Sequence, residues 1–340
     1  MDPAVYVQTN DADENEVVVF SRAENGMLAR SGRYATGGRG TGQPHLPSQS
    51  SVVLSDDRRW LLVVNAGSDE LSLFALEPHG LRFADCVSSG GTRPTSVAVS
   101  GALVYVLNNG SPNISGLDLV EGKLAALPDS TRPLSADDAD PAQISFTADG
   151  QALIVTERGT DSISSYVIDE RGYAHGPTTI KSSGKTPYGF GLTPGGSLIV
   201  TEAFGGRIGA AAASTYTMTG AGAFKLVSGS VADTRSEVCW AAVTNDGQFA
   251  FVTNFGDGTV SSYEIATDGS LTLRDPVAGT TQQGEKGVRD EGISSDGRFL
   301  YAIDADAQKV FGWAVEEDGR LTPIGEFDGV PDTVAGLAAS

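Results

Sequence analysis

A polar side chain recurs at the end of one predicted strand in successive, similar segments of this sequence. The series is Asn10, Asn65, Asn108, Glu157, Glu202, Asn254 and Asp304. Asn and Asp at strand ends usually hydrogen-bond the backbone of the next turn, so structure explains most of the series. Glu forms such turns less well. If burial raised the pKa of a Glu toward neutrality, its carboxyl could transfer protons. We therefore predict Glu157 and Glu202 as catalytic residues.

A second set of residues precedes or opens another strand of the same segments. It comprises Gln49 and Ser50, residues 93–95, residues 141–143, Pro187 and Tyr188, Cys239 and Trp240, and residues 289–291. Arginine can bind a substrate carboxylate and stabilise a developing oxyanion, so we predict Arg289 as the third catalytic residue. We predict substrate-binding roles for Arg93, Gln143, Tyr188, Trp240 and Asp290.

Other kinds of chemistry find less support. Cys239 has no plausible partner histidine, so we expect a buried core thiol. His79 and His175 fall in the hairpins EPHGL and YAHGP, where we expect solvent-exposed turn residues. His45 lies in a long polar link and could fold over a channel mouth, although a loop histidine more often has no site role. No phosphate-binding glycine loop, Ser-His-Asp signature or haem motif is present, and we expect no cofactor.

The charge balance argues against two classes of partner. The sequence holds 23 Lys+Arg against 43 Asp+Glu, a formal net charge of −20. So acidic a surface repels nucleic acid and anionic membranes. The two cysteines form neither a disulfide framework nor a zinc pattern. The first residues enter a strand pattern at once, without a signal peptide or transmembrane run. We expect a cytoplasmic protein, or a secreted or periplasmic one if a leader has been removed.

The segments that carry these residues are four-stranded β repeats. Residues 240–279 hold four short apolar runs, bounded by Asp-Gly or glycine-rich turns that favour hairpins. The turn after the first strand recurs at spacings of about 44 to 51 residues, the length of a propeller blade. The turns are Asp56-Asp57, Ser100-Gly101, Asp149-Gly150, Gly195-Gly196, Asp246-Gly247 and Asp296-Gly297.

Seven copies of the repeat fill residues 1–340, which we predict to be one domain. The copies run roughly over 4–38, 51–91, 92–135, 140–184, 185–235, 236–284 and 285–325. The first copy lacks its opening strand, and an orphan apolar strand at 333–338 can supply it, which closes the ring without open edges. We predict an all-β, seven-bladed propeller of four-stranded antiparallel blades, and we expect a monomer. Two loops, at 39–50 and 205–213, break the regularity.

Large apolar residues recur in the third strand of the copies. They are Phe20, Phe74, Leu117, Tyr166, Tyr216, Tyr263 and Trp313. Their fixed phase is typical of packing between neighbouring blades, and we do not interpret them as a cofactor site.

The repeats DGQFAFVTN and DGRFLYAID, with the seven-copy ring closure, resemble the bacterial lactonase family of seven-bladed propellers. That family includes 6-phosphogluconolactonase-like proteins and carboxymuconate-lactonising cyclases. The resemblance covers essentially the whole chain. It implies an axial site for a small anionic or lactone ligand, with ring opening by activated water or reversible ring closure.

The match to the family's site motif is partial. Members with assigned activity resemble one another in a Gly-Pro-Arg-His motif, a later Asn-Glu at a strand end, and an arginine that enters a later blade. Glu157 and Arg289 match this pattern, whereas Ala142 and Gln143 stand where Arg and His are expected. Without the His, a carboxylate must supply proton transfer.

Two alternatives to a lactonase-like enzyme stay open. A propeller that has lost the Arg-His pair can serve as a non-catalytic ligand-binding or scaffold protein. A metal-dependent, gluconolactonase-like hydrolase could use the hard oxygen ligands of Glu157, Glu202, Asn254 and Asp304.

Overall fold

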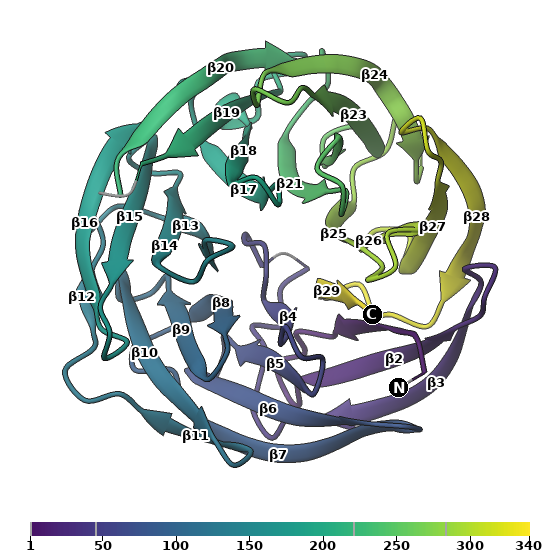
Figure 1. Cartoon of the computed structure of the whole chain (residues 1–340). Coiled ribbons are helices and arrows are strands. Elements are labelled where there is room, and N and C mark those ends of the chain that lie inside the picture. Colours follow the sequence, from purple (N-terminus) through teal and green to yellow (C-terminus); the bar gives the residue numbers. More distant parts are fainter. Residues whose placement is uncertain (1, 45, 220–221, 283) are drawn as a thin grey trace.

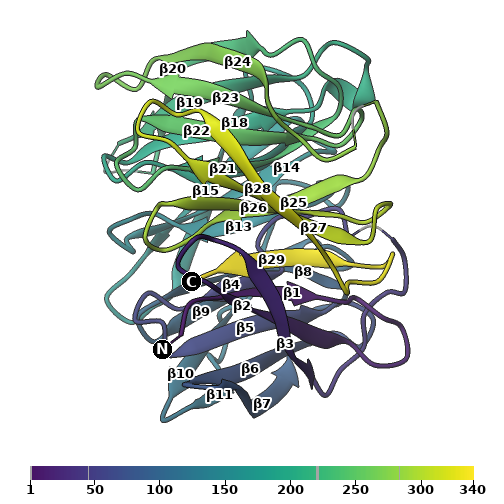
Figure 2. The ribbon, with the colours of Figure 1, turned by 90° about the vertical axis from the view of Figure 1, so that its right-hand side faces the viewer.

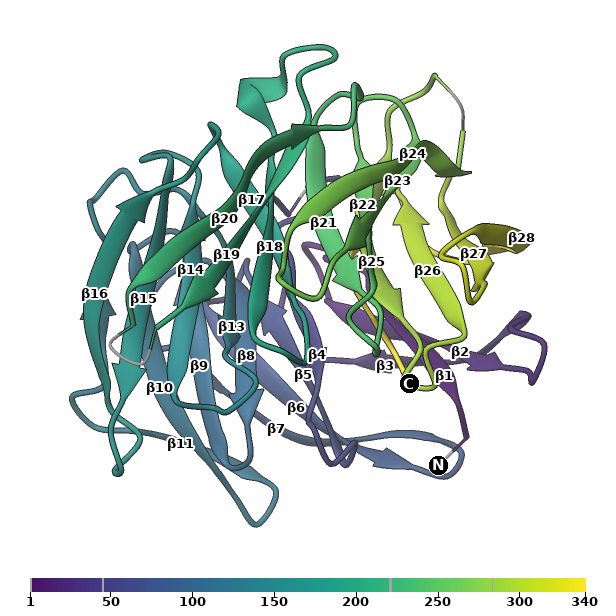
Figure 3. The ribbon, with the colours of Figure 1, turned by 45° about the horizontal axis from the view of Figure 1, so that its top comes forward.

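The computed structural model describes residues 2–44, 46–219, 222–282 and 284–340. Its strands form seven antiparallel sheets arranged as blades around one axis (Figure 1). Each sheet twists from its inner to its outer strand, which Figure 3 shows for the sheets of the upper half of the ring. This arrangement confirms the predicted seven-bladed propeller. Within the described ranges, no helix has the length and apolar character needed to cross a membrane.

The inner two strands of each blade carry the candidate site residues. The innermost strands, for blades 1 to 7, are β29 (Ala335–Ala339), β4 (Val52–Leu54), β8 (Pro94–Ser100), β13 (Pro141–Phe146), β17 (Pro187–Leu192), β21 (Val238–Val243) and β25 (Val288–Ile293). The second strands are β1 (Ala4–Gln8), β5 (Trp60–Asn65), β9 (Leu103–Asn108), β14 (Ala152–Glu157), β18 (Ser197–Glu202), β22 (Phe249–Asn254) and β26 (Phe299–Asp304).

The outer two strands complete each sheet. The third strands are β2 (Glu16–Arg22), β6 (Glu70–Glu77), β10 (Asn113–Val120), β15 (Ser162–Ile168), β19 (Ala212–Met218), β23 (Thr259–Ile265) and β27 (Lys309–Val315). The outermost are β3 (Leu28–Ala35), β7 (Gly80–Ser88), β11 (Lys123–Ala126) with β12 (Arg132–Pro133), β16 (Ala174–Lys181), β20 (Phe224–Ala232), β24 (Leu271–Thr280) and β28 (Leu321–Asp328). A short 3-10 turn, η1 (Phe204–Gly206), lies in the predicted insertion of blade 5.

Local turn chemistry fixes the hairpin between first and second strands. The Asp149 carboxylate accepts hydrogen bonds from the Thr147 hydroxyl (2.7 Å) and the Gln151 amide (3.1 Å), while Gly150 adopts a φ of 69°. Blades 2, 6 and 7 repeat the pairing of a Ser or Thr hydroxyl with an Asp two residues later. The recurring turns of the sequence are therefore stable because of contacts within a few residues.

Strand β29 closes the ring as predicted. It pairs antiparallel with β1, with Leu337 opposite Val7, and it forms the innermost strand of blade 1. Figures 1 and 2 both show the two chain ends beside each other in this blade. The pairing removes the sheet edge that blade 1 would otherwise expose.

The large third-strand residues lie in the seams between blades. All seven predicted positions are at most 2% exposed. The Tyr166 hydroxyl donates to the carbonyl oxygen of Pro133 in the preceding blade (2.9 Å), and Tyr263 does the same to Val231 (2.9 Å). These contacts confirm that the aromatic repeat is architecture.

The link between blades 1 and 2, residues 36–51, reaches the middle of the ring (Figure 1). We call Ser48, Gln49 and Ser50 of this link the axial plug. The Gln49 backbone N–H donates to the Ala142 carbonyl oxygen (3.1 Å). Its side-chain amide donates to the carbonyl oxygen of Ala241 (2.8 Å) and accepts from the Ala241 N–H (3.1 Å). One residue of the plug thus joins blades 4 and 6.

A glycine in blade 5 makes room for Gln49. In blade 4, the Gln143 side chain pairs with the backbone N–H (2.6 Å) and carbonyl oxygen (3.1 Å) of Phe190 in the next blade. The corresponding position in β17 is Gly189, where a Cβ would overlap Oε1 of Gln49. Gln49 therefore fills the space of an absent β17 side chain and makes the same two bonds to the next blade.

We expect Gly189→Ala to lower the free energy of unfolding by about 1–3 kcal/mol, the usual cost of overpacking. The added methyl group would collide with Gln49 and lie 2.5 Å from the Cys239 carbonyl oxygen. Chemical denaturation measures the change. Gly195→Ala is the control, because its Cβ would lie 3.8 Å from the nearest atom. Equal midpoints for the two variants would contradict the packing role of Gly189.

Candidate functional site

Side chains from four blades meet near the axial plug. We call this group the mouth cluster, and its members are Arg158, Tyr188, Cys239, Trp240, Phe255 and Arg289. The rings of Tyr188 and Trp240 lie 5.5 Å apart, and the Arg158 guanidinium lies 4.8 Å from the Tyr188 ring centre. The Arg289 guanidinium lies 5.0 Å from the ring centre of Phe255, which packs against the other apolar members. The structure thus brings together three predicted residues, Tyr188, Trp240 and Arg289.

Strand register explains why these residues meet. Tyr188, Cys239 and Arg289 each follow the first residue of an innermost strand. Arg158 and Phe255 each follow the last residue of a second strand. The starts of innermost strands pair with the ends of second strands in blades 4 to 7, so all these positions fall at one end of the blades.

Two arginines act on buried polar groups of the mouth cluster. Burial raises the pKa of the Tyr188 hydroxyl and of the Cys239 thiol, while the charges of Arg158 and Arg289 oppose that rise. Burial also lowers the pKa of Arg289. The Tyr188 hydroxyl is buried and has no hydrogen-bond partner among the described residues. The Tyr188 hydroxyl can therefore donate a hydrogen bond to a bound ligand. The two nearby cations favour a ligand whose acceptor atom is anionic.

Carboxylates hold the cations of this region in place. Arg158 donates to Asp140 (2.7 Å), and Lys286 pairs with Glu237 (3.1 Å) while lying 5.6 Å from the Phe255 ring centre. Sequence reasoning missed Arg158. Its only signal was its place directly after the strand end at Glu157, because nothing local shows that the side chain reaches Tyr188.

Three predicted substrate-binding residues contact the axial plug instead of an open channel. The Trp240 indole N–H donates to the Ser48 carbonyl oxygen (2.8 Å), and the Gln143 amide donates to the Ser50 hydroxyl (3.3 Å). Burial raises the pKa of Asp290 to about 7, although its carboxylate faces the backbone N–H groups of Glu291, Leu337 and Ser50, in contacts that act in the opposite direction. The substrate-binding role of these three residues stays a prediction. In this structure their polar groups form hydrogen bonds to other parts of the protein.

Glu157 is fully buried and accepts four hydrogen bonds. The donors are the Ser164 hydroxyl (2.7 Å), the Thr160 hydroxyl (2.9 Å), and both the backbone N–H and the hydroxyl of Ser135. All of them belong to blade 4 or to the link before it. The catalytic role of Glu157 stays a prediction, and these bonds favour a structural role.

Glu202 occupies the same position in blade 5 and is also fully buried. It accepts hydrogen bonds from the Gly184 N–H (2.7 Å) and from the hydroxyls of Ser182 (3.1 Å), Ser214 (2.7 Å) and Ser230 (2.7 Å). The catalytic role of Glu202 likewise stays a prediction. The longer glutamate side chain reaches the link before the blade, which explains why Glu can replace Asn here.

The remaining candidates lie away from the mouth cluster. Arg93 is exposed at the start of blade 3, where its backbone N–H donates to Asp69 (2.6 Å). His79 is an exposed turn residue, as expected, whereas His175 is largely exposed but lies in strand β16, where it pairs with Val167 and contacts Asp169 (2.9 Å). His45 lies outside the described residues.

Glu291 is a buried carboxyl in an apolar row. It faces Ala302 on the neighbouring strand, a row in which Ile144, Phe190 and Ala241 occupy the corresponding positions and pack between blades. Both Glu291 oxygens are buried without a hydrogen-bond partner among the described residues. Burial, and then the neighbouring Asp290 charge, raise the pKa of Glu291 well above its usual range.

We expect Glu291→Gln to stabilise the protein at neutral and alkaline pH and to leave it unchanged near pH 4. The unfolded chain ionises Glu291 above about pH 4.3, while the folded chain keeps it protonated, so wild-type stability falls as pH rises toward the raised pKa. Thermal unfolding from pH 4 to 9 tests this, with the exposed Glu264→Gln as control. A difference in Tm between Glu291→Gln and wild type that does not grow with pH would contradict the assignment.

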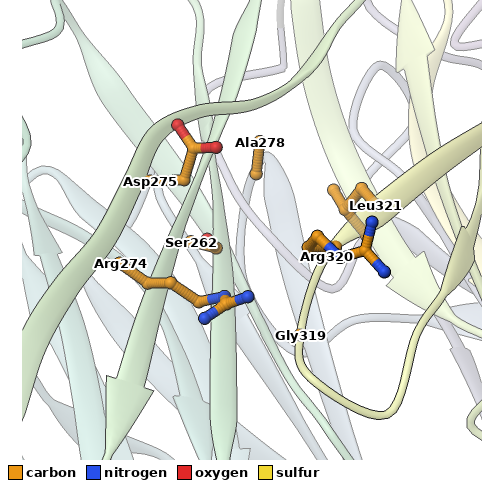
Figure 4. A pocket seen from close by; sticks show the side chains of 7 residues that line it. All are labelled: Ser262, Arg274, Asp275, Ala278, Gly319, Arg320 and Leu321. Atoms are coloured by element: carbon orange, nitrogen blue, oxygen red, sulfur yellow. The ribbon is translucent and has the colours of Figure 1, made fainter.

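Two hollows lie elsewhere in the propeller. A cavity of about 230 Å³ is lined by Ser50 and by residues of β4, β8 and β13. A hollow of about 310 Å³ lies between the outer parts of blades 6 and 7, where Arg274 and Arg320 flank Ser262 (Figure 4). Both arginines approach the carboxylate of Asp318 (3.4 and 2.9 Å). The described parts of the chain contain no group of three or more His, Cys, Asp or Glu able to hold a metal ion.

The family model "Lactonase, 7-bladed beta-propeller" matches residues 13–132, 122–203 and 201–333. The chain therefore belongs to the lactonase family of seven-bladed propellers. An uncharacterised protein of Staphylococcus aureus (strain bovine RF122) is 28% identical over 160 residues, which are 45% of this chain and 47% of that protein. The aligned part of the chain thus spans about half the length of the curated relatives it matches.

Solved structures share the fold over the full chain. A Lactobacillus plantarum protein has a TM-score of 0.78 at 18% identity and covers 100% of both chains. The periplasmic gluconolactonase of Pseudomonas aeruginosa has a TM-score of 0.77 at 16% identity, over 100% of this chain and 99% of that one. A Bacteroides uniformis protein provisionally named a 6-phosphogluconolactonase has a TM-score of 0.77 at 18% identity, over 98% and 99%. At these identities the likeness shows the fold alone.

Proposed function

We propose that this chain is a lactonase-like enzyme that opens a small, carboxylate-bearing lactone at the mouth cluster. The observation that carries the proposal is the placement of Arg158 and Arg289 around the buried Tyr188 and Cys239, in a protein whose net charge is −20. Cations gathered against that overall charge favour a small anionic ligand over nucleic acid or a membrane surface.

The two arginines take different parts in the reaction. Arg158, oriented by Asp140, binds the carboxylate of the substrate through its planar guanidinium. Arg289 lies in a more buried setting and stabilises the negative charge that develops on the lactone carbonyl oxygen. The rings of Tyr188 and Trp240 form the apolar wall beside them. Membership of the lactonase family supports this reaction type.

A ligand-binding protein without catalysis is the second candidate. Gln143 stands at the family's histidine position, and its amide is bound to Phe190 and Ser50. It therefore cannot replace a histidine in proton transfer. A metal-dependent hydrolase is the third candidate, and loss of activity on adding a chelator would favour it.

From a panel of gluconolactone, 6-phosphogluconolactone and a carboxymuconolactone, we expect wild-type protein to release acid fastest from the carboxymuconolactone, the member that carries a carboxylate. Arg289→Ala should lower kcat by about 10²–10³-fold, the cost of removing an oxyanion donor. Arg158→Ala should mainly raise KM, because it removes binding to a group that does not react. A pH-stat assay measures both constants.

Arg59→Ala is the control for the arginine variants, since that side chain is 70% exposed in the hairpin between β4 and β5. Unchanged kcat and KM in both Arg158→Ala and Arg289→Ala would overturn the assignment of the site. Saturable binding of these lactones without turnover would establish the binding protein instead.

A further inference from the structure

Asp304 departs from the pattern that holds the strand-end residues of five other blades in place. In five blades, the polar residue at the end of the second strand bonds to a serine hydroxyl on the third strand. The pairs are Asn65–Ser72 (2.7 Å), Asn108–Ser115 (3.1 Å), Glu157–Ser164 (2.7 Å), Glu202–Ser214 (2.7 Å) and Asn254–Ser261 (2.8 Å). In blade 7 the corresponding third-strand residue is Phe311, which has no hydroxyl group.

One oxygen of the Asp304 carboxylate is left unused. The side chain is fully buried, and Oδ1 accepts the Ala307 N–H (2.9 Å). Oδ2 is buried and has no hydrogen-bond partner among the described residues. A buried carboxylate oxygen without a hydrogen bond lowers the stability of the fold. Such an oxygen is explained either by a bound water or by a function.

The carboxylate lies beside the mouth cluster. Asp304 pairs in register with Val288, the residue directly before Arg289. Burial lowers the pKa of Arg289, and the charge of Asp306, followed by smaller effects that include the charge of Asp304, opposes that shift. The backbone of Gly287 also packs so closely that a Cβ there would overlap Oδ1, so the link before blade 7 covers the carboxylate. Blade 7 therefore carries a carboxylate with an unused oxygen on the strand next to the one that holds the buried Arg289.

We propose that Asp304 is the general base of the mouth cluster and activates the water that attacks the lactone. This inference rests on the proposed function, to which it adds a general base. Oδ2 takes a proton from the water as the water oxygen bonds to the carbonyl carbon, and the resulting oxyanion faces Arg289. When the ring C–O bond breaks, protonated Asp304 returns the proton to the departing oxygen. The product is a hydroxy acid, which ionises and releases one proton.

The other buried carboxyls are less suited to this role. Glu157 and Glu202 each accept four hydrogen bonds, and Asp290 faces the backbone N–H groups of Ser50 and Leu337. Glu291 lies in an apolar row, where burial and then the charge of Asp290 raise its pKa. Asp304 is the described carboxylate that combines an unused oxygen with the field of Arg289.

The test is Asp304→Asn in the full-length protein. Asn stands at this position in blades 2, 3 and 6, so the fold tolerates the residue. We expect kcat for the best lactone of the panel to fall by about 10²–10⁴-fold, the usual contribution of a general base, while KM and Tm stay near the wild-type values. Asp328→Asn, which removes an exposed carboxylate from β28 of the same blade, should keep kcat within about threefold, whereas an equal loss of kcat in Glu157→Gln or Glu202→Gln would assign the base to that residue and overturn the inference.

Chemical rescue separates catalysis from structure. Added formate should restore part of the kcat of Asp304→Ala by supplying a carboxylate, whereas chloride should not. Asp304→Asn with wild-type kcat, or Asp304→Ala that formate does not rescue, would overturn the inference while leaving the proposed function intact. A wild-type protein that opens none of the lactones would overturn both.

Discussion

The pairing of the Gln49 amide with Ala241, in the space left open by Gly189, organises the centre of this propeller. Blade 4 uses its own Gln143 for the same contact with blade 5, whereas blade 5 depends on a residue from a distant link. The link reaches the centre of the ring, where the side chains of Trp240 and Gln143 bind Ser48 and Ser50. Arg158 and Arg289 lie around Tyr188, which contacts Trp240 beside this link. The position of the candidate site thus follows from one glycine and the glutamine that fills its place.

The fold was predictable because each blade is built from contacts between residues close in sequence. Asp-Gly turns, alternating apolar residues and a regular spacing are visible without coordinates, and the orphan strand at 333–338 had one edge left to join. The site was less accessible. Tyr188, Trp240 and Arg289 could be identified from their place in the repeat. The contact of Gln49 with Ala241 spans 192 residues, and no local pattern encodes it.

Departures from the repeat are informative only after their partners are known. Glu157 and Glu202 stand out in sequence because they are longer than Asn, yet that length lets them reach donors in the links before their blades. Asp304 looks ordinary in sequence, because Asp and Asn often occupy strand ends. It becomes unusual through the loss of its third-strand serine. The sequence thus favoured Glu157 and Glu202 as catalytic residues, and in the structure each of these carboxylates accepts four hydrogen bonds.

Blade 7 concentrates features that oppose stability. Arg289, Asp290 and Glu291 are consecutive and buried, Glu291 lies in a row of apolar side chains, and Asp304 has an unused oxygen. Serines bond to the strand-end residues of five other blades, although the Oδ1 atoms of Asn108 and Asn254 are also buried without a hydrogen-bond partner among the described residues; Asp304 differs from these two in carrying a carboxylate. Proteins usually break their own local rules where function requires it, and the cost is balanced by packing elsewhere. Here the regular seams of the other blades supply that packing. The seam between blades 6 and 7, with Cys239, Phe255 and Arg289 along it, is consequently where substrate chemistry has the strongest physical reason to occur.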